Sequence, residues 1–361
     1  MKIGIIGTRG IPNKYGGFEQ FAMYFAEYLV QEGFEVTVYN SSDHPYQANS
    51  WRGVTIQPIF DPERHIGTFG QFVYDFLSIL NSRKKHYDVI FQLGYTSSSI
   101  WGWLFPKKAR IITNMDGLEW KRTKYNKWVQ AFLKTAEKWA VKQSDCLIAD
   151  SIGIQTYLKQ KYQAESVYIP YGATVFEDHN KAVLANYSLK PFSYNLVIAR
   201  LVPENNVETI IKGHLDKNST PLCIIGNFNN KYGLSLVKKY NQKVIFLGAI
   251  YDINQLNNLR YYSNLYFHGH SVGGTNPSLL EAMACSCLII AHDNPFNRAV
   301  LAQNAYYFTS EMDIQALLGL NRQTEQTKIT NNLHKIESVY SYELIHQQLK
   351  NLIKKVAKKN K

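Results

Sequence analysis

The sequence of 361 residues is short of cysteine and of acidic residues, and it has no long apolar run. Four scattered cysteines are too few for a disulfide scaffold, and no second Cys or His pair completes a zinc site, so we expect reduced thiols. No run of about 18 apolar residues is present, as a membrane-spanning helix would need, and the start "MKIGIIGTRGIP" is unlike a signal peptide. These absences predict a soluble, cytoplasmic protein.

The excess of basic residues predicts an acidic partner. Forty lysines and arginines stand against 28 aspartates and glutamates, which gives a formal net charge of +12. The basic residues gather at 82–86, 106–110, 121–127 and 350–361, and at Lys134, Lys138 and Lys142. Solvated helix faces are the ordinary explanation of such runs. The aromatic residues interleaved with the basic ones between 119 and 142 favour an anionic membrane surface instead.

Strands alternate with helices in two successive series. The first begins with an apolar strand, a loop with glycines, an amphipathic helix that ends at Gly33, and a second strand, which together form one βαβ unit. Its further strands are expected at 54–60, 87–94, 109–115 and 145–151. The second series is expected at 194–201, 221–228, 243–250, 263–270, 287–293 and 304–309. This alternation predicts an α/β protein with two doubly wound, Rossmann-like domains, 1–167 and 168–339, that face each other across a cleft.

The stretch "GHSVGGTNPSLLEAMA" (269–284) follows a predicted strand and begins a predicted helix. A helix N-terminus has unpaired backbone N–H groups and a partial positive charge, so a preceding loop of small residues suits a phosphate. Ordinary turn and capping chemistry is the alternative for a lone loop of this kind. Because ligands of doubly wound sheets bind at the carboxyl ends of strands, the position of the loop favours a phosphate site in the cleft.

Several motifs of other enzyme classes are missing. The first loop, "GTRGIPNKYGGFE" (7–19), has its glycines at the wrong spacing for G-x-G-x-x-G, which disfavours a dehydrogenase or epimerase. The sequence also lacks a P-loop ending in GK[ST] and a D-x-D motif. His268 and His270 have no further ligands at a suitable spacing, so polar roles at a strand end are expected for them. We therefore expect neither a metal ion nor a cofactor.

Several longer motifs resemble a known enzyme family. The segments "IPYGA" (169–173), "IARLVPENN" (198–206) and "TNPSLLEAMA" (275–284) resemble retaining GT-B glycosyltransferases of family 4. More narrowly, "GTRGIPNKYGGFE", "NMDGLEWKRTKY" (114–125) and "HGHSVGGTNPSLLEAM" (268–283) resemble the bacterial rhamnosyltransferases that make cell-wall and capsular polysaccharides. The similarity runs over nearly the whole chain. It implies the GT-B fold, with a C-terminal helix at about 340–361 that packs back on the first domain.

The resemblance assigns roles to residues of both domains. Glu281 would accept hydrogen bonds from the sugar of the nucleotide, and Arg200 would lie against the diphosphate. Backbone N–H groups would face the phosphate or the donor sugar at Gly273, Gly274, Thr275 and Asn276. Gly16 and Gly17 would let the backbone of the first domain approach the diphosphate or the acceptor, although a flexible turn is the alternative for these two glycines.

Two positions depart from the family pattern. An acid that contacts the donor sugar in relatives is replaced here by Gly273, and a common lysine is replaced by Asn205. These contacts must come from the backbone or from other side chains, for which Lys121 and Lys231 are candidates.

Asp116 and Glu119 follow a predicted strand and should stand at the cleft. An acid at this point can receive the acceptor proton, so both are candidate catalytic residues. The alternative is that Asp116 caps the following helix.

The resemblance implies an enzyme that transfers a hexose with retention of configuration. L-rhamnose from dTDP-β-L-rhamnose is the expected donor, and a hydroxyl of a lipid-linked saccharide at the inner face of the cell membrane is the expected acceptor. A transferase that uses a UDP-sugar is one alternative. Another is a noncatalytic basic adaptor that binds membrane or RNA, although Arg200, Glu281 and both glycine loops argue against a decayed site. Nucleic acid is not expected as a partner of the enzyme.

Overall fold

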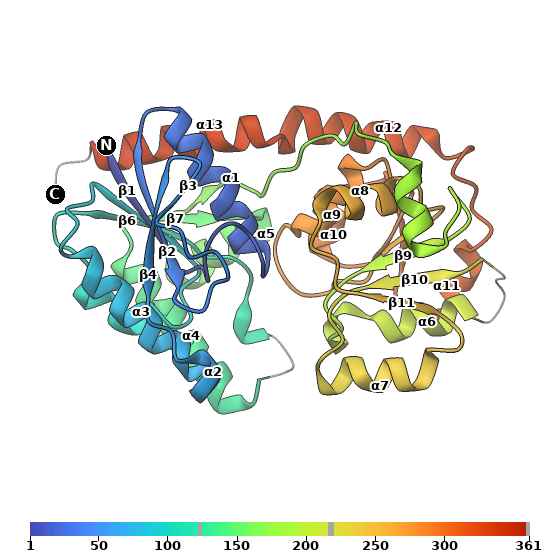
Figure 1. The fold of residues 1–361 in the computed structure, drawn as a ribbon, viewed down its shortest axis with the longest axis horizontal. Helices are drawn as coiled ribbons and strands as arrows, with labels where there is room; N and C mark the ends of the chain where they lie inside the picture. The colour runs from blue at the N-terminus through green and yellow to red at the C-terminus, as the bar shows by residue number, and fades with distance from the viewer. Residues whose placement is uncertain (122–124, 216–219, 359–361) are drawn as a thin grey trace. The chain divides into compact units, whose positions relative to one another are not determined.

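The computed structural model describes residues 1–121, 125–215 and 220–358. The chain forms two compact units, of which the first is Met1–Pro170 with Glu343–Lys361 and the second is Tyr171–Tyr342 (Figure 1). The boundary expected between residues 167 and 168 falls inside the last strand of the first sheet, Val167–Tyr168. Within the described residues, no helix is both long and apolar enough to cross a bilayer.

The first unit contains an eight-stranded sheet in the order β3-β4-β2-β1-β5-β6-β7-β8. Its strands are β1 Lys2–Ile6, β2 Glu35–Ser41, β3 Ser50–Trp51, β4 Val54–Ile59, β5 Val89–Leu93, β6 Arg110–Asn114, β7 Cys146–Ala149 and β8 Val167–Tyr168. Only the short edge strand β3 pairs antiparallel among these strands. The central strands β1 and β5 are buried almost completely, as the continuous apolar runs of parallel strands predict.

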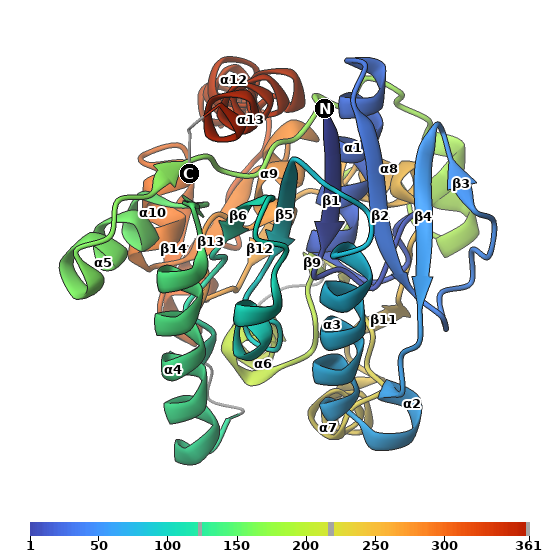
Figure 2. The same cartoon turned by 90° about the vertical axis from the view of Figure 1, so that its left-hand side faces the viewer.

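Helices cover both faces of this sheet. They are α1 Gly17–Gln31, α2 Glu63–Ile66, α3 Phe69–Ser82, α4 Lys127–Gln143, α5 Ile152–Tyr162 and α13 Tyr342–Ala357, with the 3₁₀ turns η1 Ser99–Leu104 and η2 Glu119–Lys121. Phe21 and Phe25 of α1 pack on Phe91 of β5. The opposite face carries α3, η1 and α4 (Figure 2). The C-terminal helix α13 lies against α1, where Lys350 pairs with Glu32 at 3.0 Å.

The second unit has a six-stranded parallel sheet in the order β11-β10-β9-β12-β13-β14. The strands are β9 Asn195–Ile198, β10 Leu222–Ile225, β11 Ile245–Gly248, β12 Tyr266–His268, β13 Ile289–His292 and β14 Tyr306–Phe308. The helices are α6 Val207–Leu215, α7 Lys231–Tyr240, α8 Ile253–Tyr261, α9 Pro277–Ala284, α10 Pro295–Leu301, α11 Glu311–Leu317 and α12 Gln326–Lys335, with the short turns η3 Lys181–Tyr187, η4 Pro203–Asn205 and η5 Ile336–Tyr340. The strand order reverses between β9 and β12, so the loops that follow these two strands flank the usual ligand position of such sheets.

The predicted alternation of strands and helices is confirmed in both units. Gly33, which was expected to end the first helix, has a positive φ of 81° two residues after α1. The four cysteines are free thiols, and all but Cys146 are buried.

Candidate active site

Two loops of the second unit meet at the point where its strand order reverses. The loop after β9 and the loop after β12 are braced by hydrogen bonds from Ser271 N and Oγ to the carbonyl of Glu204, at 3.1 and 2.7 Å. Asn206 Nδ2 donates to the carbonyl of Gly269 at 2.8 Å. A Cβ at Gly269 would lie 2.1 Å from the Asn205 carbonyl oxygen, so only glycine allows this approach. The two loops therefore form one rigid edge.

Arg200 stands on this edge just after β9, with an exposed side chain. Its backbone carbonyl accepts a hydrogen bond from Asn205 Nδ2 at 2.8 Å. Asn205, which occupies the position of the family lysine, is buried and holds the loop together. It therefore cannot replace the charge of that lysine, and Arg200 is the cation that the loop presents.

The loop 273–276 leads into α9, but the first turn of α9 satisfies its own N–H groups. Pro277 has no N–H, and the Asn276 side chain accepts from Ser278 N at 2.9 Å. The Asn276 carbonyl accepts from the N–H groups of Leu279 and Leu280. The N–H groups of residues 278–280 are thus engaged within the cap of the helix, whereas the phosphate contacts are predicted at residues 273–276 of the loop before it. An anion would have to use the preceding loop, where Gly273 has φ of 135° and open space around it, and Thr275 is buried.

Glu281 lies one turn into α9 and pairs with Arg260 of α8. Arg260 is 1% exposed, and its Nη1 donates to Asn257 Oδ1 at 2.8 Å. Burial opposes the charge of this guanidinium, but the attractions of Glu281, Tyr266 and the two nearby thiols together outweigh it, and the pKa of Arg260 is raised. The Glu281 side chain keeps 14% of its surface exposed. Nothing in the sequence pattern indicated Arg260.

Histidines gather at the ends of β12 and β13. The rings of His268 and His270 stack at 4.4 Å, and burial next to His270 and His292 lowers the pKa of His268 well below its usual value. His268 is thus a neutral imidazole. No group of His, Cys, Asp and Glu within the described ranges has the arrangement of a metal site.

The first loop of the other unit, between β1 and α1, is held by ion pairs. Arg9 forms two hydrogen bonds to the carboxylate of Glu63, at 2.9 and 2.8 Å, and its backbone N–H donates to Glu19 Oε1 at 2.9 Å. Gly16 is the N-cap of α1, and Gly17 is the first residue of this helix. Arg9 and Lys14 of this loop balance the two carboxylates of Glu19 and Glu63. Glu19 is visible in the motif "GGFE", but the sequence does not show that its buried carboxylate contacts the first loop.

Asp116 and Glu119 follow β6, as expected. Asp116 has φ of 50° and its N–H donates to Asn114 Oδ1 at 3.1 Å, while Glu119 begins the turn η2. Helix α4 is capped by Asn126, whose side chain accepts from Val129 N at 3.0 Å, so Asp116 does not cap α4. Residues 122–124 of the basic run lie outside the described residues, and Lys121 stands over the ring of Trp120 at 5.6 Å.

Glu137 of α4 fixes the loop that carries the two acids. Its buried carboxylate accepts a hydrogen bond from Trp120 Nε1 at 3.2 Å. Four other donors surround it: Tyr95 Oη, Tyr157 Oη, Tyr162 Oη and Lys161 Nζ. Trp120 is the residue after Glu119, so this network holds the loop in one position. Sequence analysis missed Glu137 because its partners are far apart in the chain.

Asp75 of α3 is a second buried acid near this edge of the sheet. Its Oδ2 accepts from Ser97 Oγ at 2.6 Å, and burial raises its pKa to about 7. The neighbouring Tyr74 donates to the carbonyl of Thr8 in the first loop at 2.9 Å.

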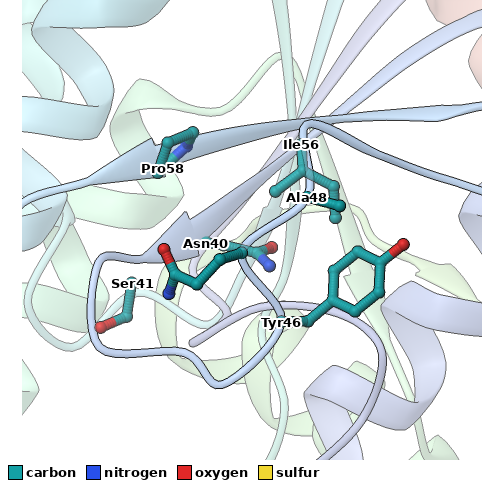
Figure 3. A pocket seen from close by; sticks show the side chains of 7 residues that line it. Asn40, Ser41, Tyr46, Ala48, Ile56 and Pro58 are labelled. Atoms are coloured by element: carbon teal, nitrogen blue, oxygen red, sulfur yellow. The ribbon is translucent and has the colours of Figure 1, made fainter.

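A small pocket lies beside β2 and β4 (Figure 3). It is lined by Asn40, Ser41, Tyr46, Gln47, Ala48, Ile56 and Pro58, none of which is a predicted site residue. The Asn40 side chain is engaged with the backbone of Ile11, at 3.1 Å to its N–H and 2.8 Å to its carbonyl. This pocket is therefore lined by a side chain that holds the first loop in place.

Two family models match the chain. Residues 1–174 match "Domain of unknown function (DUF1972)", and residues 188–336 match "Glycosyl transferases group 1". None of the curated proteins compared with the chain matches it.

Solved structures resemble the chain over its whole length. Sucrose-phosphate synthase from Thermosynechococcus elongatus has a TM-score of 0.82 and 17% identity over 98% of both chains. Anabaena HepE, in complex with UDP and glucose, has a TM-score of 0.78 and 16% identity over 98% of this chain and 100% of its own. Trehalose 6-phosphate synthase from Burkholderia multivorans has a TM-score of 0.71 and 10% identity over 99% and 96%. The predicted fold class is confirmed, and the chain is a glycosyltransferase with the GT-B fold and a domain of glycosyl transferases group 1.

Proposed function

We propose that this glycosyltransferase transfers L-rhamnose from dTDP-β-L-rhamnose to a hydroxyl of a lipid-linked saccharide with retention of configuration. The observation that carries the proposal is the braced edge of the second unit, where the exposed Arg200 follows β9 and the partly exposed Glu281 follows the loop 273–276. A nucleotide sugar has a diphosphate and a ribose or deoxyribose, which suit a guanidinium and a carboxylate respectively. The rhamnosyl donor rests on the resemblance of the motifs at 7–19, 114–125 and 268–283.

In this proposal each group has a separate task. Arg200 and the loop 273–276 neutralise the diphosphate as it leaves, so no metal ion is required. The acceptor oxygen attacks the anomeric carbon on the face from which the diphosphate departs, and the acceptor proton passes to the Asp116 carboxylate or to an oxygen of the leaving diphosphate. Glu119 is the second candidate for this role. Gly16 and Gly17, at the start of α1, let the backbone of the first unit approach the diphosphate or the acceptor in this proposal.

A lipid-linked acceptor is supported by the surface of the first unit formed by α3, η1 and α4. The acids of these three elements, Asp75 and Glu137, are both buried, whereas α4 exposes Lys127, Lys134, Lys138 and Lys142. The aromatic residues Phe69, Trp103 and Trp128 are also exposed there. A surface with cations, aromatic rings and no exposed acid fits an anionic bilayer, so we place the enzyme at the cytoplasmic face of the cell membrane.

The alternative donor is a UDP-sugar, because Anabaena HepE was obtained with UDP and with UDP-glucose. Incubation with dTDP-rhamnose, UDP-glucose and other donors, with a panel of lipid-linked saccharides, would decide this through the product masses. We expect product from dTDP-rhamnose, and thymidine diphosphate at 100 times its dissociation constant should stabilise the fold by about 2.7 kcal/mol. Product from UDP-sugars alone would overturn the rhamnosyl assignment.

The variant Asp116→Asn tests the role of Asp116 in the same assay. If Asp116 receives the acceptor proton, the variant should bind nucleotide normally and turn over on the order of 100-fold more slowly. A fully active variant would remove Asp116 from the mechanism, and Glu119 and the leaving diphosphate would then remain as the proposed acceptors of the proton.

A further inference from the structure

The pair of Arg260 and Glu281 joins two helices beside the candidate nucleotide site. The guanidinium of Arg260 makes two hydrogen bonds. Its Nη1 donates to Asn257 Oδ1 of α8 at 2.8 Å, and its Nη2 donates to Glu281 Oε2 of α9. Its Nε is buried without a partner in the described part of the chain. Arg260 is the largest of the side chains that are almost fully buried.

A buried ion pair is a poor device for stability alone. Removing a guanidinium from water costs several kcal/mol, and apolar residues of similar volume often pack equally well or better in its place. Another role for the pair is therefore more plausible than stability, and this role concerns the effect of Arg260 on Glu281. Arg260 donates a hydrogen bond to one oxygen of Glu281, while 14% of the Glu281 side chain remains exposed.

We propose that Arg260 is a positioning residue that holds the carboxylate of Glu281 in one orientation, aimed at the sugar hydroxyl of the nucleotide. Without the guanidinium, the Glu281 side chain loses the hydrogen bond that fixes its direction beside α8. The planar guanidinium binds Glu281 and Asn257 from one rigid group, which an ammonium cannot reproduce. The inference rests on the proposed function, because it assumes that Glu281 faces a nucleotide.

The test compares nucleotides with and without the sugar hydroxyl. Thymidine diphosphate and 3′-deoxythymidine diphosphate, and likewise UDP and 2′,3′-dideoxyuridine diphosphate, differ only in these hydroxyl groups. Calorimetry on the full chain should show that the wild type prefers the hydroxylated member by about 10-fold or more, because a hydrogen bond to a charged group is lost in the other. Arg260→Met should abolish this preference while both members of each pair still bind weakly through the base and the diphosphate.

A purely structural pair gives a different result. Loss of packing would weaken both members equally and leave their ratio unchanged, so a retained 10-fold preference in Arg260→Met would overturn the inference. Arg260→Lys keeps the charge and should retain part of the preference, which keeps the test decisive if the methionine variant melts early. Arg298→Met, which removes the exposed partner of Asp293 on α10, is the matched control and should bind as the wild type does.

The same measurements separate this inference from the proposed function. A wild type that binds none of the four nucleotides contradicts the proposed function itself. A wild type that binds them without preferring the hydroxylated members contradicts the role of Glu281 and the inference with it. In the variant Glu281→Gln the preference should be lost, and adding Arg260→Met should lower it no further, since the two residues act as one unit.

Discussion

Two buried acids of the first unit have opposite surroundings. Glu137 accepts hydrogen bonds from three tyrosines, a tryptophan and a lysine, so its charge is compensated although it is almost fully buried. Asp75 is equally enclosed but has one hydroxyl, Ser97 Oγ, at 2.6 Å. Burial of a carboxylate is costly unless donors satisfy its oxygens, and Asp75 has few of them. Glu137 is therefore a structural anchor of the loop at 115–121, and Asp75 is a group that titrates near neutral pH.

Asp75→Asn should stabilise the protein at high pH. Burial raises the pKa of Asp75 to about 7, above the value of about 3.9 in an unfolded chain. The folded state thus holds a proton that the unfolded state releases between these values, and the stability that Asp75 contributes is present below about pH 4 and lost as the pH rises through 7. The asparagine still accepts from Ser97 and does not titrate.

Thermal melting of both proteins at pH 5 and pH 8 measures this effect. We expect the variant to gain over the wild type at pH 8, by up to about 4 kcal/mol, because three pKa units correspond to about 1.4 kcal/mol each. The gain should be clearly smaller at pH 5. Ser97→Ala is a control that removes the hydroxyl and leaves the acid, so its melting should remain at least as dependent on pH. Parallel pH curves for Asp75→Asn and the wild type would contradict the pKa of Asp75.

At the scale of elements, the sequence predicted which segments form strands and helices better than it predicted how their ends are used. The apolar runs and glycine loops located β1, β9, β12 and α9, because burial on both faces and tight turns leave a local pattern. The capping of α9 by Asn276 and Pro277 was visible as turn chemistry, and the structure shows that this cap engages the N–H groups of residues 278–280, while the predicted phosphate contacts lie at 273–276.

The contacts that were missed join residues distant in the chain. Glu281 meets Arg260 from the preceding helix, and Glu137 meets Tyr95 from the loop after β5. Neither arginine nor glutamate on an amphipathic helix shows in the sequence whether it points to solvent or to the interior. Tertiary packing decides this, and a local pattern does not contain it.

The docking of helix α13 on α1 should weaken in acid through His346. Its ring is buried 5.5 Å from the ring of Phe25 and 5.1 Å from that of Tyr28, and burial lowers the pKa of His346 to about 4. The unfolded chain binds a proton near pH 6.5, so stability is full above that value and falls as the pH drops towards 4. The hydrogen bond from Lys350 lowers the pKa of the nearby Glu32.

His346→Phe removes this proton while keeping an aromatic ring against Phe25 and Tyr28. Between pH 7 and pH 4.5 the wild type should lose more stability than the variant, by up to about 3 kcal/mol, which denaturant unfolding at each pH can measure. His334→Phe, a change at a residue of α12 in the second unit, controls for the loss of any histidine. If both variants follow the wild type, burial of His346 does not contribute to the acid sensitivity.

At the scale of the molecule, the basic residues that give the net charge of +12 are unevenly distributed. Helices α3 and α4 run along one face of the first sheet (Figure 2). The layer of α3, η1 and α4 combines exposed lysines with a series of aromatic contacts. Phe69 contacts Phe72, Phe72 contacts Phe132 across the two helices, and Phe132 contacts Trp139. Trp128 is 87% exposed at the start of α4, and Phe69 is 75% exposed at the start of α3. Water is an unfavourable environment for exposed rings of this size, which supports the proposal that this face binds a lipid headgroup layer.

This face should bind anionic vesicles and release them in salt. The triple variant Lys127→Glu, Lys138→Glu, Lys142→Glu should lower binding to phosphatidylglycerol vesicles by on the order of 100-fold, because each basic residue near such a surface contributes about 1 kcal/mol. The triple variant Lys190→Glu, Lys238→Glu, Lys243→Glu changes the net charge equally at exposed positions of the second unit and should bind nearly as the wild type does. Flotation at low and high salt measures all three proteins. Equal losses in the two variants would mean that overall charge, and not this face, attracts the vesicle, and a wild type that stays unbound at low salt would favour an acceptor in solution.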